Sequence, residues 1–537
     1  MQKLVLGAAA VSLALGFSAP ARAEFALNIL HINDFHSRFE SITGSDSTCN
    51  AEGESKGECF GGIARLKTAL DQTRADLKAK GENVIFLSAG DEFQGSLFYT
   101  TYKSKVVADF FNELGLDAAA TGNHEFDDGP EEFSKFIETA NFPIIGGNFN
   151  VAKEPLLAGK IVGVHILDVG GEKVGLVGAL AEDTPEISST GPNVAFEKAV
   201  TYVRGAVEAL EAQGVNKIIV LSHIGYTVDQ ALAEAVPGID VIVGGHSHTL
   251  LSNTDEKAAG PYPTVVKAPD GKDVPIVTAG QYGKYLGDIK VVWDNEGNVI
   301  SAKGDPILLD ASIKPDEGFV TRVAELGAPI EELKAKVIGN ATEAIEGSRE
   351  ICRAMECTMG NLVADAMLDR VKDQGVTIAI QNGGGLRASI DQGDITMGEV
   401  LTVLPFSNTL ATFQLKGADV VAALENGVSD VENGAGRFPQ VAGLKFSWTK
   451  DKPAGDRIIK VEVQDGDAWV PIDPAKTYGV VTNNFMRTGG DGYAVFNTAG
   501  MNAYDFGPPL EDVLADFIAK QGGHYKPYTD GRIAEVK

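Results

Sequence analysis

The chain has 537 residues, too many for one hydrophobic core, and this length predicts at least two domains. Its composition, 44% hydrophobic and 22% charged, is that of a globular protein and excludes wholesale disorder and a collagen-like chain. The formal net charge of −28 argues against a protein that coats nucleic acid, because an acidic surface repels the phosphodiester backbone. Small phosphate ligands stay compatible with it, since a bound cation can reverse the local charge.

The first 23 residues have the pattern of a secretory signal peptide. Lys3 gives a positive start, Leu4–Phe17 is an apolar run, and Ala21 and Ala23 are small residues at the positions that a signal peptidase reads. The run is shorter than the roughly 20 residues needed to span a membrane, which argues against an anchor. We therefore expect a periplasmic or secreted protein with no membrane segment after cleavage.

After the signal, short apolar runs alternate with amphipathic stretches, a pattern that predicts a layered α/β domain. A helical pattern over residues 314–337, broken at Ala328-Pro329, predicts a connecting helix. Beyond it we expect a helix over 361–371, then mixed strands and loops over 401–414 and through the 440s to 480s. In the first half the predicted strands are 27–32, 84–87, 117–120, 174–180, 217–221, 241–243, 275–278 and 288–293, with helices at 63–77 and 199–212.

The four cysteines lie in two close pairs, Cys49 with Cys59 and Cys352 with Cys357. Three connectivities are possible, and proximity favours two local disulfides that close small loops, as expected in an oxidising compartment. The alternative is a four-cysteine zinc site, which the long separation and the spacings argue against.

Polar motifs follow five of the predicted strands. In chain order they read NDFH, GDEFQGS, GNHEFD, SHIG and GGHSH. Ligands of open α/β sheets bind just beyond the carboxyl ends of strands. A lone histidine is usually a core or surface residue, as we expect for His31, His165 and His524, but the other five of the 8 histidines lie in these motifs. The candidate metal ligands are Asp34, His36, Asp91, Asn123, His223, His246 and His248.

Asp, Asn and His without thiolate favour borderline divalent cations such as Zn²⁺ or Mn²⁺. Seven ligands with a central Asp91 predict two ions about 3.5–4 Å apart that share this carboxylate. Such a pair lowers the pKa of bound water and neutralises charge on a phosphorus centre. His124, next to Asn123, is placed to donate to a substrate oxygen, and Asp127 can fix the tautomer of its ring.

On these motifs and their order, the chain resembles the secreted 5′-nucleotidase family, which includes periplasmic UDP-sugar hydrolases and ecto-5′-nucleotidases. The resemblance covers essentially the whole chain after the signal. It implies a four-layer α/β metallophosphoesterase sandwich over residues 24–313, a connecting helix over 314–337 and a second α/β (α+β) substrate-binding domain over 338–537. Rotation of the second domain would carry substrate to the metals, with Gly327 and Pro329 as hinge candidates.

The resemblance also assigns the ligands to two ions and makes His124 and Asp127 the catalytic pair. Many members carry Gln or Asn where this chain has His248, so the metal preference stays open. One ion is expected on Asp34, His36, Asp91 and His248, and the other on Asp91, Asn123, His223 and His246.

Four segments of the C-terminal half, CRAMEC, NGGGLR, LPFSN and NFMRTGGDGY, resemble the family's nucleotide site. In the family a base stacks between two aromatic side chains, an Asp binds ribose and arginines bind phosphate. Stacking suits any base and an Arg fork suits phosphate. A single Phe is more often a core residue, but both of these lie in loops rich in Gly, Pro and Asn. The expected substrate residues are Arg353, Asn382, Arg387, Phe406, Asn408, Phe485 and Asp491.

The leading hypothesis is therefore an exported two-metal hydrolase of nucleoside 5′-monophosphates, with UDP-sugars as further candidate substrates and a monomer or weak dimer as the expected form. One alternative is a 2′,3′-cyclic-nucleotide phosphodiesterase with 3′-nucleotidase activity. A second is the thiosulfohydrolase relatives, which have little use for Phe406 and Phe485. A third is a non-catalytic nucleoside-binding surface protein, in which we would expect some of the metal-ligand residues to be replaced.

Overall fold

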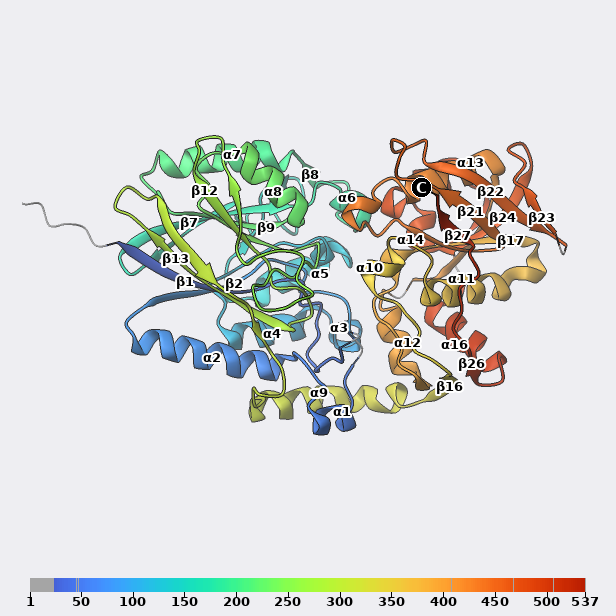
Figure 1. The fold of residues 1–537 in the computed structure, drawn as a ribbon, viewed down its shortest axis with the longest axis horizontal. Coiled ribbons are helices and arrows are strands. Elements are labelled where there is room, and N and C mark those ends of the chain that lie inside the picture. Colours follow the sequence, from blue (N-terminus) through green and yellow to red (C-terminus); the bar gives the residue numbers. More distant parts are fainter. Residues whose placement is uncertain are drawn as a thin grey trace, which may run out of the picture.

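A computed structural model describes residues 24–536 apart from residues 45, 47, 407, 467 and 506, so the predicted signal peptide lies outside the described residues. The chain forms two lobes that lie side by side, with helix α9 (Glu317–Lys334) running along one edge of the pair (Figure 1). Each lobe has hydrophobic cores of its own. Among the described helices, none is long and apolar enough to cross a membrane.

The N-terminal lobe is a four-layer α/β sandwich, as predicted. Two sheets pack face to face through an apolar layer, and helices cover the outer face of each. The first sheet has the order β14 (Val299–Gly304), β13 (Tyr285–Trp293), β1 (Phe25–Ile32), β2 (Asn83–Ser88), β3 (Ala118–Ala120), β4 (Ile144–Ile145), and α2 (Ile63–Ala79), α4 (Ser104–Leu114) and α5 (Gly129–Thr139) pack on it. The second has the order β11 (Thr264–Lys267), β12 (Asp273–Val277), β10 (Val241–Gly244), β9 (Ile218–His223), β7 (Glu172–Leu180), β6 (Val164–Val169), covered by α7 (Ala199–Glu211) and α8 (Tyr226–Ala235).

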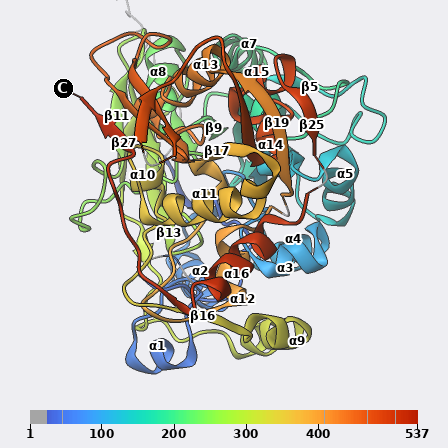
Figure 2. The ribbon, with the colours of Figure 1, turned by 90° about the vertical axis from the view of Figure 1, so that its right-hand side faces the viewer.

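The C-terminal lobe is built on a five-stranded mixed sheet and two smaller sheets, and it faces the viewer in Figure 2. On one face of the central sheet lie α11 (Thr358–Val371) and α16 (Leu510–Lys520), and on the other lies α13 (Gly417–Gly427). The central order is β20 (Pro439–Ala442), β17 (Val376–Asn382), β24 (Thr477–Asn483), β19 (Leu410–Lys416), β25 (Met501–Tyr504). One smaller sheet has the order β18 (Gly393–Thr396), β16 (Val337–Ala341), β26 (His524–Tyr525). The other has the order β23 (Ala468–Pro471), β22 (Ile458–Asp465), β21 (Leu444–Trp448), β27 (Ile533–Glu535).

The eight predicted strands all coincide with observed ones, namely β1, β2, β3, β7, β9, β10, β12 and β13, and the predicted helices coincide with α2, α7 and α11. Two predictions were wrong in part. The connecting helix is shorter than expected and continuous through Pro329. Pro329 cannot donate to the carbonyl of Glu325, while the Tyr102 hydroxyl donates to the neighbouring Leu326 carbonyl at 2.7 Å.

The other correction concerns residues 401–414, which were expected to contain only strands and loops. Helix α12 (Met397–Val403) extends into this range. A capping box, in which the side chains of Thr396 and Glu399 each accept from the other residue's backbone N–H, begins this helix. The capping residues Thr396 and Glu399 lie five and two residues before position 401, outside the range expected to hold strands and loops.

Both local disulfides are present, Cys49–Cys59 and Cys352–Cys357, so the four-cysteine zinc site is excluded. The first closes a loop that contains the short helix α1 (Ala51–Lys56). The second closes the turn that leads into α11 and so fixes the segment that carries Arg353.

Candidate functional site

The five polar motifs meet at one end of the sandwich. In the first sheet β1, β2 and β3 are parallel neighbours, and in the second β7, β9 and β10 are, so the carboxyl ends of each set lie at one edge. The six predicted ligands with His or Asp side chains form two groups whose potential ligand atoms lie within 4.8 Å of one another and which share Asp91. The groups are Asp34, His36, Asp91 and His248, and Asp91, His223 and His246. The seventh predicted ligand, Asn123, has its Oδ1 2.9 Å from His246 Nδ1.

Most of these ligands sit on left-handed backbone. Five of the seven have φ between 50° and 73°, a region that costs a side-chain-bearing residue roughly 1–3 kcal/mol. Cross-loop hydrogen bonds hold this backbone, for example from His36 N to Asp91 O at 3.0 Å. The five are Asp34, His36, Asp91, His246 and His248.

Two glycines allow the loops to approach this closely. A Cβ atom on Gly122 would lie 2.3 Å from the backbone nitrogen of Asp91, and one on Gly245 would lie 2.7 Å from the carbonyl oxygen of Ala89. Both contacts are with backbone, which cannot move aside without moving a ligand loop. Any larger residue at these positions would therefore push the ligands apart.

In His36 and His223, hydrogen bonds donated by the outer ring nitrogen aim the inner nitrogen at the cluster. His36 Nδ1 lies 3.0 Å from the carbonyl oxygen of Phe93, and His223 Nδ1 lies 2.6 Å from that of Ala89. A carbonyl only accepts, so each Nδ1 carries the proton. The Nε2 atoms then face inward. His223 Nε2 is 3.0 Å from Asp91 Oδ2 and His248 Nε2 is 3.2 Å from Asp34 Oδ1.

The protonation of the site fits divalent cations. Burial lowers the pKa of His246 to about 3 and holds the pKa values of His36 and His248 well below the usual range, so these rings are neutral, the form that binds a metal. Burial also lowers the pKa of His223, but Asp91, Asp34 and the Ala89 carbonyl together raise it, to about 10. Cation binding at His223 would therefore release a proton. A donor set of carboxylate oxygens and imidazole nitrogens suits a borderline or hard divalent ion.

Glu125, which was not among the predicted site residues, connects two of the loops that carry predicted ligands. Its buried carboxylate accepts from the backbone N–H groups of Asp91 at 3.1 Å, Glu92 at 2.8 Å and Gly122 at 2.6 Å. Glu125 directly follows His124 in the motif GNHEFD. The sequence therefore contains the acidic residue in a site motif, but it does not indicate which backbone N–H groups the carboxylate binds.

The predicted catalytic pair is in contact. His124 Nδ1 lies 2.6 Å from Asp127 Oδ2, and the backbone N–H of His124 donates to Asp91 Oδ1 at 2.9 Å. The ring of Phe406 from the other lobe stacks on His124, with centroids 5.8 Å apart and planes 17° apart. The histidine is thus fixed between the Asp91 loop and the C-terminal lobe.

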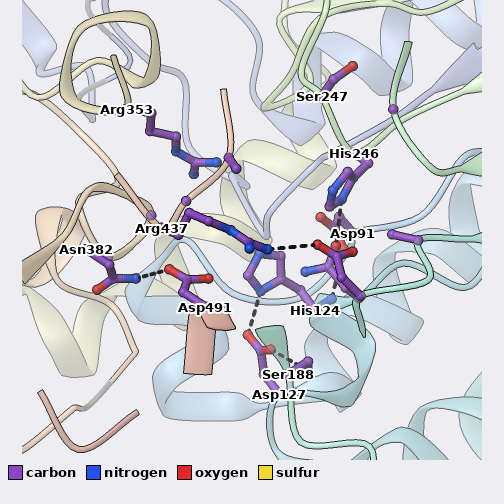
Figure 3. Close-up of a pocket in the computed structure, with 18 of the residues that line it drawn as sticks. Asp91, His124, Asp127, Ser188, His246, Ser247, Arg353, Asn382, Arg437 and Asp491 are labelled. Atoms are coloured by element: carbon purple, nitrogen blue, oxygen red, sulfur yellow. Dashed lines mark hydrogen bonds and ion pairs between the residues drawn. The ribbon is translucent and has the colours of Figure 1, made fainter. Parts of the chain in front are cut away.

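A cavity of about 700 Å³ separates the two lobes at this point. Figure 3 shows Asp91 and His246 on one side of it and Arg353, Asn382 and Asp491 on the other. All seven predicted substrate residues line this one cavity, namely Arg353, Asn382, Arg387, Phe406, Asn408, Phe485 and Asp491.

Contacts within this set hold the C-terminal wall of the cavity. Asn382 Nδ2 donates to Asp491 Oδ2 at 2.6 Å, and a Cβ atom on Gly490 would lie 2.5 Å from the ring of Phe485. The Arg387 guanidinium lies 5.6 Å from the centre of the Phe406 ring, and its Nη2 is 3.2 Å from His36 Nε2. Arg387 thus reaches from the C-terminal lobe into the histidine cluster.

Two further arginines line the cavity and were not predicted. Arg349 donates from Nη1 to the carbonyl oxygen of His246 at 3.2 Å, and Arg437 Nη2 lies 3.8 Å from Asp183 Oδ2. Arg349 precedes Arg353 by one helical turn, a spacing that could have indicated it. Arg437 lies in the glycine-containing loop GAGRF, but only the fold brings this loop to the site.

Each of the two lobes matches a known family of protein domains. The calcineurin-like phosphoesterase family model matches residues 27–250, and the 5′-nucleotidase C-terminal domain model matches residues 337–498. The 5′-nucleotidases of Bos taurus and Homo sapiens are each 39% identical over 538 residues, which cover 96% of this chain and 92% of the relative. The crystal structure of a 5′-nucleotidase precursor from Thermus thermophilus is similar with a TM-score of 0.90 at 41% identity, over 95% of this chain and 99% of that one.

Proposed function

The chain belongs to the 5′-nucleotidase family, and from this premise we propose that it hydrolyses nucleoside 5′-monophosphates to a nucleoside and phosphate. The observation that carries the proposal is the shared cavity, which has an Asp/His cluster on one wall and arginines with two phenylalanines on the other. A phosphate ester whose leaving group carries an aromatic base matches both walls. UDP-sugars offer the same two chemical features and are proposed as further substrates.

We propose that two divalent cations, Zn²⁺ or Mn²⁺, are held by the seven ligands, with Asp91 shared. When bound, such a pair supplies an activated water and neutralises charge on the phosphate. The inward-facing Nε2 atoms of His36 and His223 support this assignment, because the Nδ1 protons of both rings are already used.

The proposed role of His124 is to hold a proton toward a substrate oxygen. Although burial opposes it, the Asp127 carboxylate raises the pKa of His124 above the ordinary value, which favours the protonated ring. Asp127 accepts from Nδ1 and leaves Nε2 as the donor. Arg353 and Arg387 would bind the phosphate, and both are nearly buried, where charge-assisted hydrogen bonds are strong.

The nucleoside is proposed to bind through Phe406 and Phe485, with Asp491 accepting from ribose hydroxyls. The hydrogen bond from Asn382 orients the Asp491 carboxylate. Residues 24–313 are proposed as the catalytic domain, 314–337 as the connection and 338–537 as the substrate domain. Export to the periplasm or medium is proposed from the signal pattern, and two disulfides support it.

A substrate panel tests the proposal. Phosphate release is measured from AMP, 3′-AMP, cyclic 2′,3′-AMP and UDP-glucose, each with and without a chelator. Chelator-sensitive release that is fastest from AMP is the expected result. Faster release from the cyclic or 3′ substrate would favour the alternative phosphodiesterase, and no release from any substrate would favour a binding protein.

A further inference from the structure

Ser188 adds a third side chain to the His124–Asp127 pair. Its hydroxyl donates to Asp127 Oδ1 at 2.8 Å, while Asp127 Oδ2 lies 2.6 Å from His124 Nδ1. Figure 3 shows the three side chains in contact in the order His124, Asp127, Ser188. Each oxygen of the Asp127 carboxylate therefore has its own partner, and the carboxylate cannot turn without losing one of them.

The segment that carries Ser188 is anchored in the N-terminal lobe. It leaves β7, and the backbone N–H of Ala181 donates to the carbonyl oxygen of His223 at 2.9 Å. The Thr184 hydroxyl, at the first residue of the short helix α6 (Thr184–Ile187), donates to the Ala181 carbonyl at 2.6 Å. Ser188 follows as the residue that ends α6. The hydrogen bond to the His223 carbonyl thus anchors the segment that carries Ser188 to a residue of the Asp/His cluster.

The same segment contacts the C-terminal lobe. Helix α6 packs against the turn η5 (Gly490–Gly492), which contains Asp491. Asp183, just before α6, lies 3.8 Å from the guanidinium of Arg437. Ser188 therefore lies in a segment that joins the catalytic pair to the wall where the nucleoside is proposed to bind.

From these contacts we propose that Ser188 is a positioning residue that acts through Asp127 on His124. The proposal rests on the proposed hydrolase function. A carboxylate held at only one oxygen can rotate, and the histidine that it orients then samples other ring positions. The Ser188 hydroxyl restrains that rotation. Its proposed effect is on the catalytic step and not on nucleotide binding, since its hydroxyl is committed to the hydrogen bond with Asp127.

A double-mutant cycle tests this dependence. Ser188→Ala is expected to lower kcat about tenfold, the usual scale for residues that orient a catalytic group, with KM for AMP unchanged. In the Asp127→Ala background the same substitution should cause no further loss, because the residue through which it acts is gone. Ser188→Thr, which keeps a hydroxyl, should stay within about threefold of the wild type. Ser55→Ala, at an exposed position outside the cavity, serves as the matched control, and thermal unfolding verifies that every variant is folded.

Three results would overturn the proposal: independent, multiplying losses in the double mutant, a rise in KM without a fall in kcat, or equal losses in Ser188→Ala and Ser188→Thr. All three leave the wild-type hydrolase active. Failure of the hydrolase function itself would appear instead as a wild-type protein that releases no phosphate, so the two failures are distinguishable.

Discussion

Asp91 is the residue on which both halves of the metal cluster depend. Its Oδ2 lies 3.0 Å from His223 Nε2 and 3.8 Å from His36 Nε2. Asp91→Ala is expected to lower AMP hydrolysis roughly 10³-fold or more and to reduce bound metal to at most one ion, because the carboxylate shared by the two groups is gone. Turnover and elemental analysis measure this. Asp168→Ala, at an exposed strand position, is the control, and a variant that keeps two ions would contradict the shared role.

The two phenylalanines differ in their surroundings, and this predicts different kinetic effects. Phe485 packs on Gly490, whereas Phe406 also stacks on His124. Phe485→Ala should raise KM for AMP about tenfold, since a stacked base contributes about 1–3 kcal/mol, and leave p-nitrophenyl phosphate nearly unaffected. Phe406→Ala should raise the same KM and also lower kcat, because a neighbour of His124 is removed. Equal effects on both substrates would show that neither residue stacks on a base.

A buried carboxyl group far from the cavity predicts a pH dependence of stability. Burial raises the pKa of Asp240 to about 7, and its Oδ2 accepts from the backbone N–H of Ile218 at 2.7 Å. In the unfolded chain an Asp titrates near 3.9. Between these values the folded state binds more protons, so the contribution of Asp240 to the unfolding free energy is present below about pH 4 and is lost as the pH rises to about 7.

Asp240→Asn keeps the acceptor and removes this titration. The unfolding free energy of the variant relative to the wild type should therefore increase from pH 4 to pH 8, as measured by urea unfolding. Asp168→Asn should show no such trend. A difference that stays constant with pH would mean that Asp240 is already ionised in the folded protein.

Helix α12 is stabilised by a capping box at one end and contacts a residue of the cavity at the other. Its capping box begins the helix, and its carbonyl at Val403 accepts from the backbone N–H of Arg387 at 3.0 Å. Thr396→Ala is expected to lower the unfolding free energy by about 1 kcal/mol while kcat/KM for AMP changes less than twofold. Urea unfolding and steady-state kinetics give the two numbers. Thr321→Ala, exposed within α9, is the comparison, and a large loss of activity would instead assign Thr396 to the site.

Strand periodicity and turn residues predicted the elements of the N-terminal lobe closely, because long apolar runs such as β7 and β9 are buried on both faces. The same reasoning failed at α9, where the helix was expected to break at Ala328-Pro329, although the proline removes only one internal hydrogen bond and the helix continues. It also could not pair β25 with β19 or place β27 beside β21, since such short exposed strands have no pattern of their own.

At the scale of the whole molecule, separate cores predict separate unfolding. The apolar clusters of the two lobes do not mix, and the Asp/His cluster belongs entirely to the first lobe. Calorimetry should show two transitions, of which a chelator lowers only one, because a ligand stabilises the unit that binds it. A control scan with chelator already saturated by Ca²⁺ should match the untreated protein. A single transition that shifts as a whole would contradict this independence.

The Asp/His cluster could be predicted from the sequence because each of its residues ends or follows a strand, and the carboxyl ends of these strands meet at one end of the sandwich. The cavity wall on the other lobe was accessible only through family resemblance. Arg349 and Arg437 come from the C-terminal lobe and Ser188 from the end of α6, so their places at the site depend on tertiary packing. No local pattern encodes that packing for Arg437 and Ser188, whereas the one-turn spacing from Arg353 could have indicated Arg349.

The ligands also lie far apart along the chain, and this has a consequence for how the protein matures. The backbone N–H of His246 donates to Asp34, 212 residues away, and the two come from different sheets. Contacts of such long sequence separation form late, after both sheets have closed on each other. Neither half of the cluster can then assist the early steps of folding, so metal uptake should follow first-lobe assembly. Refolding of the N-terminal lobe should accordingly proceed at the same rate with and without metal, and only unfolding should be slowed by it.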